Sequence, residues 1–226
     1  MVIKSDILEL DKTKCCEIAL ELFMEESGCS KEGEKYDRMR KEAFQVLDVI
    51  KSGIDIKAIY SFYDELQFDG PVLTVEGREF RCTAFEQLDS EAIEGAYFYA
   101  VSAGDYYLED KPIMQQLYAD IWGTAFTDAI RRMLVDMLKQ NHAVSDSFGP
   151  GFYGMDVIEM KKMPEMVDFG RLGMEVRDSC VILPLKSCAG ILFKVNEKYR
   201  RLNSACELCY GSKKTCTLCS IRNHII

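Results

Sequence analysis

The sequence has few histidines and no long hydrophobic run. Only two of its 226 residues are histidine, His142 and His224, so catalysis that depends on several histidines is hard to build. No apolar stretch approaches the roughly 18–20 residues that a membrane-spanning helix needs. The first residues carry charge at Lys4, Asp6 and Glu9 and lack the apolar core of a secretory signal. We therefore expect a cytoplasmic protein that does not associate with membranes.

Basic side chains are outnumbered. The chain has 28 Lys and Arg residues against 37 Asp and Glu residues, which gives a net charge of −9. A general DNA or RNA binder neutralises phosphates with clustered Lys and Arg, so nucleic acid is not an expected partner. Hydrophobic residues make up 48% and charged residues 29%, which excludes wholesale disorder. The length fits one domain, or one domain with a small appendage.

The ten cysteines form two groups. In a reducing cytosol, clustered cysteines are typical of metal sites, and scattered ones behave as small buried apolar residues. The scattered group is Cys15, Cys16, Cys29, Cys82, Cys180 and Cys188. The clustered group is Cys206, Cys209, Cys216 and Cys219, two CxxC pairs separated by six residues. Four thiolates in this pattern suit a tetrahedral zinc ion or an iron–sulfur cluster of the 4Fe–4S type, and the spacing fits either.

Hydrophobic periodicity predicts a chain of mixed helices and strands. Helices are expected over residues 11–26, 36–51, 112–140 and 157–169. Strands are expected over residues 58–62, 71–75, 80–85, 96–102, 174–176, 180–183 and 190–195. Residues 145–153 are expected to form a loop. The helix over 112–140 is apolar on several sides, which indicates a central helix packed on several sides.

Two residues of this long helix carry further expectations. Asp110 can cap its N-terminus, with Pro112 in the first turn. Asp128 lies two turns after Ile121 and so shares its face. A structural role for Asp128 is an ion pair with Arg131 or Arg132 at the rim of the core.

A glycine-rich loop is the first candidate ligand site. Gly149, Pro150 and Gly151 are surrounded by Phe148, Phe152 and Tyr153. Glycine lets a ligand approach the main chain, and aromatic rings suit a flat or cationic ligand. The alternative is a tight turn with aromatic packing. The segment 186–190 is also rich in small residues, which allow close backbone packing or a ligand across the strand. Cys188 within it is a weak candidate nucleophile, since no base lies nearby in the sequence.

Three segments carry a family resemblance: 120–132 (DIWGTAFTDAIRR), 148–152 (FGPGF) and 184–190 (PLKSCAG). In this order they resemble the reactivation domain of cobalamin-dependent methionine synthase, and more closely its free-standing form in anaerobic bacteria. The resemblance covers roughly residues 50–196. It implies an α+β fold, a C-shaped mixed domain with an antiparallel sheet, around the long central helix. The chain then divides into an N-terminal helical segment (1–52), the activation-like domain (53–202) and a short Cys-rich metal-binding tail (203–226).

The resemblance also implies ligand-binding residues. The family loop Arg-x-x-Pro-Gly-Tyr, which holds S-adenosylmethionine (AdoMet), is matched by Pro150 and Gly151. Ser147 and Phe152 stand at the Arg and Tyr positions, and Cys180 stands where the family has a later Tyr. The implied AdoMet-binding set is Gly149, Pro150, Gly151, Phe152, Tyr153, Ser187, Gly190 and Asp128. No catalytic residue is assigned.

The function implied is that of an accessory protein. It docks on a corrinoid-dependent methyltransferase, such as methionine synthase, and supports reductive reactivation of cob(II)alamin with AdoMet as methyl donor. Cobalamin comes only through this partner, and an electron-donor protein is a second expected partner. An iron–sulfur cluster in the tail could relay the electron, whereas zinc is redox-silent. The alternative is a non-enzymatic module that binds a corrinoid protein and has a structural zinc tail.

Overall fold

A computed structural model describes residues 3–106 and 108–202 of the chain. The expected α+β class, with an antiparallel sheet and a long central helix, is confirmed. The helices are α1 (Lys12–Glu26), α2 (Glu34–Ile50), α3 (Ile113–Lys139) and α4 (Met163–Met166). The strands are β1 (Ile3–Ile7), β2 (Lys57–Tyr63), β3 (Gln67–Asp69), β4 (Val72–Val75), β5 (Arg78–Arg81), β6 (Ile93–Gly104), β7 (Ala143–Phe148), β8 (Glu175–Val176), β9 (Ile182–Leu183) and β10 (Lys186–Val195).

The main sheet has five strands in the order β1-β2-β6-β10-β7, and all neighbours are antiparallel. β6 and β10 pair along their whole length, from Gly104 opposite Lys186 to Ile93 opposite Val195. Ten consecutive residues of β6, 95–104, are buried, because both faces of the sheet are covered. A strand buried on both faces has a continuous apolar sequence instead of an alternating one.

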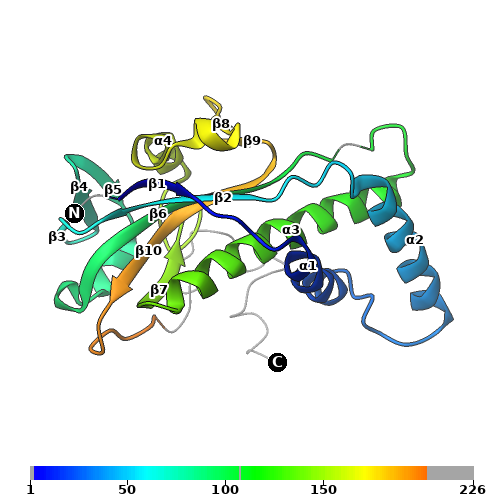
Figure 1. Cartoon of the computed structure of the whole chain (residues 1–226), viewed down its shortest axis with the longest axis horizontal. Coiled ribbons are helices and arrows are strands. Elements are labelled where there is room, and N and C mark those ends of the chain that lie inside the picture. The colour runs from blue at the N-terminus through cyan, green and yellow to red at the C-terminus, as the bar shows by residue number, and fades with distance from the viewer. Residues whose placement is uncertain (1–2, 107, 203–226) are drawn as a thin grey trace.

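Two hydrophobic clusters lie on opposite faces of the sheet. On one face, Phe98 and Phe193 pack against residues of α4 and its flanking turns, among them Met163 and Phe169. On the other face, α3 packs against the sheet and against α1 and α2. Figure 1 shows α3 running from the strands at one end of the molecule to α1 and α2 at the other. This position explains why α3 is apolar on several sides.

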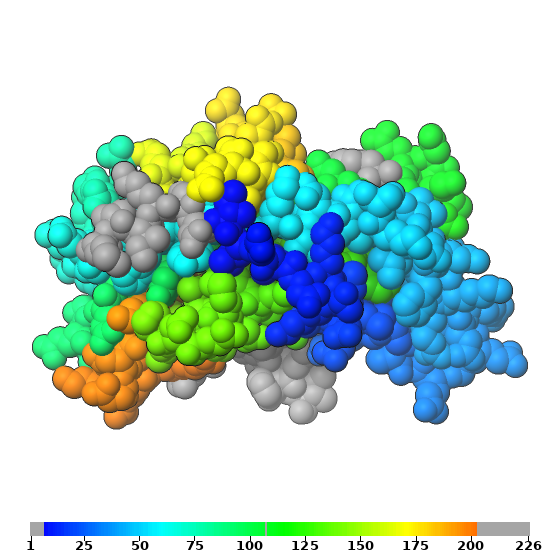
Figure 2. Space-filling view, viewed as in Figure 1, coloured from blue at the N-terminus to red at the C-terminus, as the bar shows by residue number. Residues whose placement is uncertain are grey.

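Trp122 joins the three long helices. Its ring stacks on Phe23 of α1, with centroids 3.7 Å apart and an interplanar angle of 7°. Its Nε1 donates a hydrogen bond to the backbone carbonyl of Ala43 in α2 at 3.0 Å. Residues 12–50 therefore pack on the core. On the face seen in Figure 2, the N-terminal segment (dark blue) crosses the middle of the molecule and α2 (lighter blue) forms one end.

Three expectations about secondary structure are wrong. Asp110 does not cap α3; Pro112 occupies the N-cap position, so Asp110 lies too far back to reach the first-turn amides. The helix expected over 157–169 is split into a 3₁₀ turn (Val157–Lys162), α4 and a second 3₁₀ turn (Phe169–Leu172), because Val167 is extended after the short helix that contains Pro164. The loop expected over 145–153 begins only after β7, whose polar Ser145 is buried.

The scattered cysteines follow their expectation in part. Cys15, Cys29 and Cys82 are buried, Cys180 and Cys188 are half-buried, and Cys16 is exposed. No helix in the described ranges is long and apolar enough to cross a membrane.

Candidate functional site

The three segments that carry the family resemblance meet in the fold, although up to 70 residues separate them in the sequence. We call the place where they meet the motif junction: residues 120–131 of α3, residues 186–190 of β10, and residues 147–149 at the end of β7. Thr127 Oγ1 of α3 donates to the backbone carbonyl of Lys186 at 3.1 Å. Phe148 of β7 pairs with Ile191 of β10. The fold therefore brings parts of the three segments together.

Lys186 fastens β10 to α3. Its Nζ lies 2.6 Å from Asp120 Oδ1 and 3.4 Å from Thr124 Oγ1, and its side chain is 17% exposed. The aliphatic stem crosses α3 at Gly123, where an added Cβ would lie 2.6 Å from Lys186 Cγ. Glycine at this point in the helix thus makes room for the lysine stem.

Two glycines let the end of β7 lie close against β10. A Cβ at Gly190 would be 2.7 Å from the carbonyl oxygen of Phe148 and 2.8 Å from Tyr99 Oη. A Cβ at Gly149 would be 3.0 Å from the carbonyl oxygen of Ala189. Both distances to Gly190 are shorter than real Cβ contacts, so only glycine fits there without movement of β7 or Tyr99.

A pair of hydroxyl groups lies beside Gly190. Tyr99 Oη of β6 and Ser147 Oγ of β7 are 2.5 Å apart, within hydrogen-bond distance. Tyr99 is almost fully buried, and burial raises the pKa of its hydroxyl, so it stays protonated at neutral pH. Ser147 is half-buried and stands at the family's Arg position. The sequence contains no signal that Tyr99 would reach Ser147.

Asp128 forms an ion pair with Arg131, one of the two partners expected. Arg131 Nη2 and Nε lie 3.0 Å and 3.2 Å from Asp128 Oδ1, and the two side chains are 34% and 43% exposed. The Arg131 guanidinium also lies close enough to Cys188 to oppose the effect of burial on this thiol. Burial prevails and raises the pKa of Cys188 to about 12, so a thiolate nucleophile is disfavoured.

The loop after β7 is a closed turn. The amides of Gly151 and Phe152 donate to the carbonyls of Met155 and Gly149 at 2.9 Å each. Left-handed backbone supports the turn at Gly151 (φ 92°) and Tyr153 (φ 54°). In this conformation both amides therefore form hydrogen bonds within the loop. The expectation that the loop offers free main-chain groups to a ligand does not hold for these two amides.

The aromatic residues of the loop differ in exposure. Tyr153 packs on Phe148, with ring centroids 4.9 Å apart, and Phe148 is fully buried. Phe152 is 66% exposed. Pro150 is half-buried. A ligand at this loop would thus meet the ring of Phe152 first.

The predicted ligand residues do not all share one face of the sheet. Cys188 belongs to the α3 side, whereas Ala189 and Ile191 belong to the opposite cluster. Ser187 alternates with Cys188, and its Oγ hydrogen bonds to Ser102 Oγ at 2.9 Å. Ser187 therefore faces away from α3, while Gly190 lies on the α3 side beside Tyr99.

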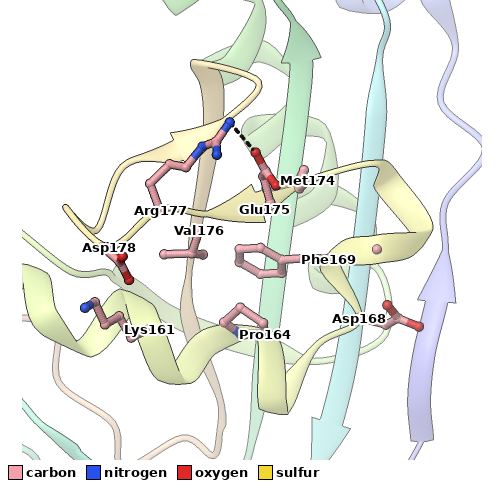
Figure 3. A pocket seen from close by; sticks show the side chains of 10 residues that line it. Lys161, Pro164, Asp168, Phe169, Met174, Glu175, Val176, Arg177 and Asp178 are labelled. Atoms are coloured by element: carbon pink, nitrogen blue, oxygen red, sulfur yellow. Dashed lines mark ion pairs between the residues drawn. The ribbon is translucent and has the colours of Figure 1, made fainter.

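Three pockets lie around the described surface. One of about 390 Å³ is shown in Figure 3, where Arg177 pairs with Glu175 at 2.8 Å above Phe169 and Pro164. A second of about 500 Å³ shares Pro164 with the first. A third of about 370 Å³ includes Asp120 in its lining, so it adjoins the motif junction. The first lies beside α4 and β8 and the second beside α4, β2 and β5, and neither has a junction residue in its lining.

The predicted metal ligands Cys206, Cys209, Cys216 and Cys219 lie outside the described residues. Within residues 3–106 and 108–202, no group of three or more His, Cys, Asp or Glu side chains could hold a metal ion.

Comparison with solved structures identifies the fold. A crystal structure of the MetH reactivation domain bound to AdoHcy (S-adenosylhomocysteine) matches with a TM-score of 0.62 over 86% of this chain and 79% of that chain. This chain has the fold of the MetH reactivation domain. The two sequences are 12% identical, so the likeness lies in the fold and in few shared side chains. No family model matches the sequence. No curated protein matches it either.

The structural match to the MetH reactivation domain is also wider than the sequence resemblance. Residues 50–196 are about two thirds of the chain, and the matched part is 86% of it. The match therefore includes residues beyond the range in which the motifs occur.

Proposed function

We propose that this chain is an accessory protein that docks on a corrinoid-dependent methyltransferase and supports reductive reactivation of its cob(II)alamin. The observation that carries the proposal is the motif junction. Three short segments that resemble a reactivation domain meet at one place, in a chain with the fold of a reactivation domain that was crystallised with AdoHcy. We further propose that the protein acts in the cytoplasm.

AdoMet is the proposed small-molecule ligand, and residues of the junction and of the loop after β7 suit its chemical groups. AdoMet combines an adenine ring, a sulfonium cation and an amino acid end. The exposed ring of Phe152 offers a face for adenine or for the sulfonium. The carboxylate of Asp128 offers a partner for the ammonium group. AdoMet supplies a methyl group to reduced cobalt in the partner protein and leaves as AdoHcy.

The tail is proposed to hold the metal. Four thiolates from Cys206, Cys209, Cys216 and Cys219 form a donor set that suits zinc or a 4Fe–4S cluster. A cluster would pass the reducing electron from a donor protein, whereas zinc would stabilise the tail only. Iron, zinc and acid-labile sulfide, measured in protein purified without oxygen, distinguish the two. Cys206→Ser and Cys216→Ser should each lose the metal, and unchanged content in both variants contradicts this part.

The test of function uses a methionine synthase that lacks its own reactivation domain and holds cob(II)alamin. The protein, AdoMet and a low-potential chemical reductant are added without oxygen, and the corrinoid absorbance is followed. We expect methylcobalamin to form only when all three are present. A complex that shifts the corrinoid spectrum without AdoMet-dependent methylation would favour the non-enzymatic binding module. Absence of both a complex and methylation would refute the proposal for this partner class.

A further inference from the structure

Two cationic side chains, Lys186 and Arg131, lie at the motif junction, and they differ in how many of their donor groups already have partners. The ammonium of Lys186 is held by Asp120 and Thr124, and its side chain is 17% exposed. Arg131 is 34% exposed and contacts a single oxygen of Asp128 through Nε and Nη2. Among the described residues, Nη1 of Arg131 has no hydrogen-bond partner. Arg131 can therefore accept an additional anionic group, whereas Lys186 is already committed.

Arg131 lies over the part of β10 that the loop after β7 approaches. Thr127 bonds to Lys186, and Arg131 follows Thr127 by four residues, about 6 Å along the helix. Cys188 follows Lys186 by two residues, about 6.6 Å along the strand. Helix and strand thus advance together, which sets the guanidinium beside Cys188. The influence of Arg131 on the pKa values of Cys188 and Tyr99 agrees with this placement.

The hydroxyls of Tyr99 and Ser147 complete the surroundings. The two groups carry two protons, and their mutual hydrogen bond at 2.5 Å uses one. The second proton is available for donation to a ligand oxygen. Because Tyr99 is buried and Ser147 is half-buried, the donor that a ligand meets is Ser147. The α3 side of the junction therefore combines a guanidinium, a hydroxyl donor and the carboxylate of Asp128.

We infer that Arg131 binds the carboxylate of an α-amino acid ligand, the amino acid end of AdoMet or AdoHcy, with the Ser147 hydroxyl beside it. The guanidinium comes from α3, while Ser147 in β7 supplies only a hydroxyl. Asp128 lies next to the same guanidinium and receives the ligand's ammonium group. This inference rests on the proposed function, because it names the residue that selects that ligand.

The test compares AdoHcy with its decarboxylated analogue, which keeps the amine, the sulfur and the adenosine. Affinities are measured by calorimetry for the wild type and for Arg131→Gln. A charge-assisted contact with a carboxylate corresponds to about ten- to a hundredfold in affinity. We expect Arg131→Gln to lower the affinity for AdoHcy by about this factor and to leave the affinity for the analogue unchanged. Arg131→Lys should recover part of the loss, because it keeps the charge but not the planar fork.

Arg132→Gln is the matched control, because Arg132 is the neighbouring arginine and is exposed. It should bind both compounds like the wild type. Equal AdoHcy affinity in the Arg131 and Arg132 variants would overturn the inference and leave the proposed function standing. A wild type that binds neither compound would overturn the inference together with AdoMet binding. Circular dichroism checks folding, and Asp128 is exposed enough to stay hydrated without its partner.

Discussion

Gly190→Ala tests whether the close approach of β7 to β10 builds the junction. The new Cβ would lie 2.7 Å from the carbonyl oxygen of Phe148 and 2.8 Å from Tyr99 Oη. The first is a backbone atom of a strand residue paired with Ile191, so it cannot move without shifting β7. The second belongs to the buried side chain of Tyr99, whose hydroxyl forms a hydrogen bond with Ser147. The new methyl group must therefore displace either β7 or the side chain of Tyr99.

The cost of Gly190→Ala follows from these contacts. Overpacking of this kind costs about 1–3 kcal/mol. Loss of the hydrogen bond between Tyr99 and Ser147 adds about 0.5–1.5 kcal/mol. For a chain of this size, 1 kcal/mol corresponds to about 2–4 °C in the unfolding midpoint. The two costs together are about 1.5–4.5 kcal/mol, so we expect the midpoint to fall by roughly 3–18 °C, measured by circular dichroism.

Gly53→Ala is the control for Gly190→Ala. Its Cβ would have ordinary contacts, the nearest being the carbonyl oxygen of Ile50 at 3.5 Å, and its backbone is not left-handed. It should leave the midpoint unchanged or raise it slightly. Equal midpoints for the two variants would refute the claim that β7 and β10 meet in van der Waals contact at Gly190.

Three further predictions concern stability, each measured by urea denaturation. Trp122→Phe removes the indole hydrogen bond to the Ala43 carbonyl and part of a buried ring, and it should lower the free energy of unfolding by about 1–3 kcal/mol; a loss below about 0.5 kcal/mol would contradict the role of the indole N–H. Burial raises the pKa of Cys15 from 9.0 to about 12, so the folded state keeps this proton longer than the unfolded state. The free energy of unfolding should therefore fall between pH 9 and 12, by up to about 1.4 kcal/mol per pH unit for this group. Cys15→Ala should flatten the fall far more than Cys16→Ala, because burial of Cys15 is the main cause of its raised pKa and the neighbouring Cys16 the lesser one. Lys186→Met keeps the aliphatic stem but loses the ion pair with Asp120, and it should lower the free energy of unfolding by about 1 kcal/mol. An unchanged free energy of unfolding would show that this ion pair does not stabilise the fold.

The sequence predicted the elements whose patterns depend on burial alone. The long helix was recognisable because it is apolar on several sides, and its packing against the sheet, α1 and α2 is the reason. β7 was missed because Ser145 looks like a loop residue. In the fold it is buried, and its Oγ accepts a hydrogen bond from the amide of Phe193 at 2.8 Å. A polar residue satisfied by a distant strand leaves no periodic signal in the sequence.

The candidate site was predictable as a set of segments, but not as an arrangement. The order of the motifs indicated which parts of the chain belong together. The direction of Ser187 depends on the register of β10, which shifts between Lys186 and Ser187. The closed turn at Gly151 depends on hydrogen bonds within the loop. The proximity of Tyr99 and Arg131 to Ser147 and Cys188 follows from topology, which spacing along one segment does not contain.

The place of Trp122 gives the protein an intrinsic optical reporter. It is the only tryptophan in the sequence, and its side chain is fully buried between helices α1, α2 and α3. The indole fluorescence of the protein therefore comes from one site, stacked on Phe23 and bonded to Ala43. Separation of α1 or α2 from α3 would hydrate the ring and shift its emission to longer wavelength. Movement of the N-terminal helices during docking can thus be followed without an added label.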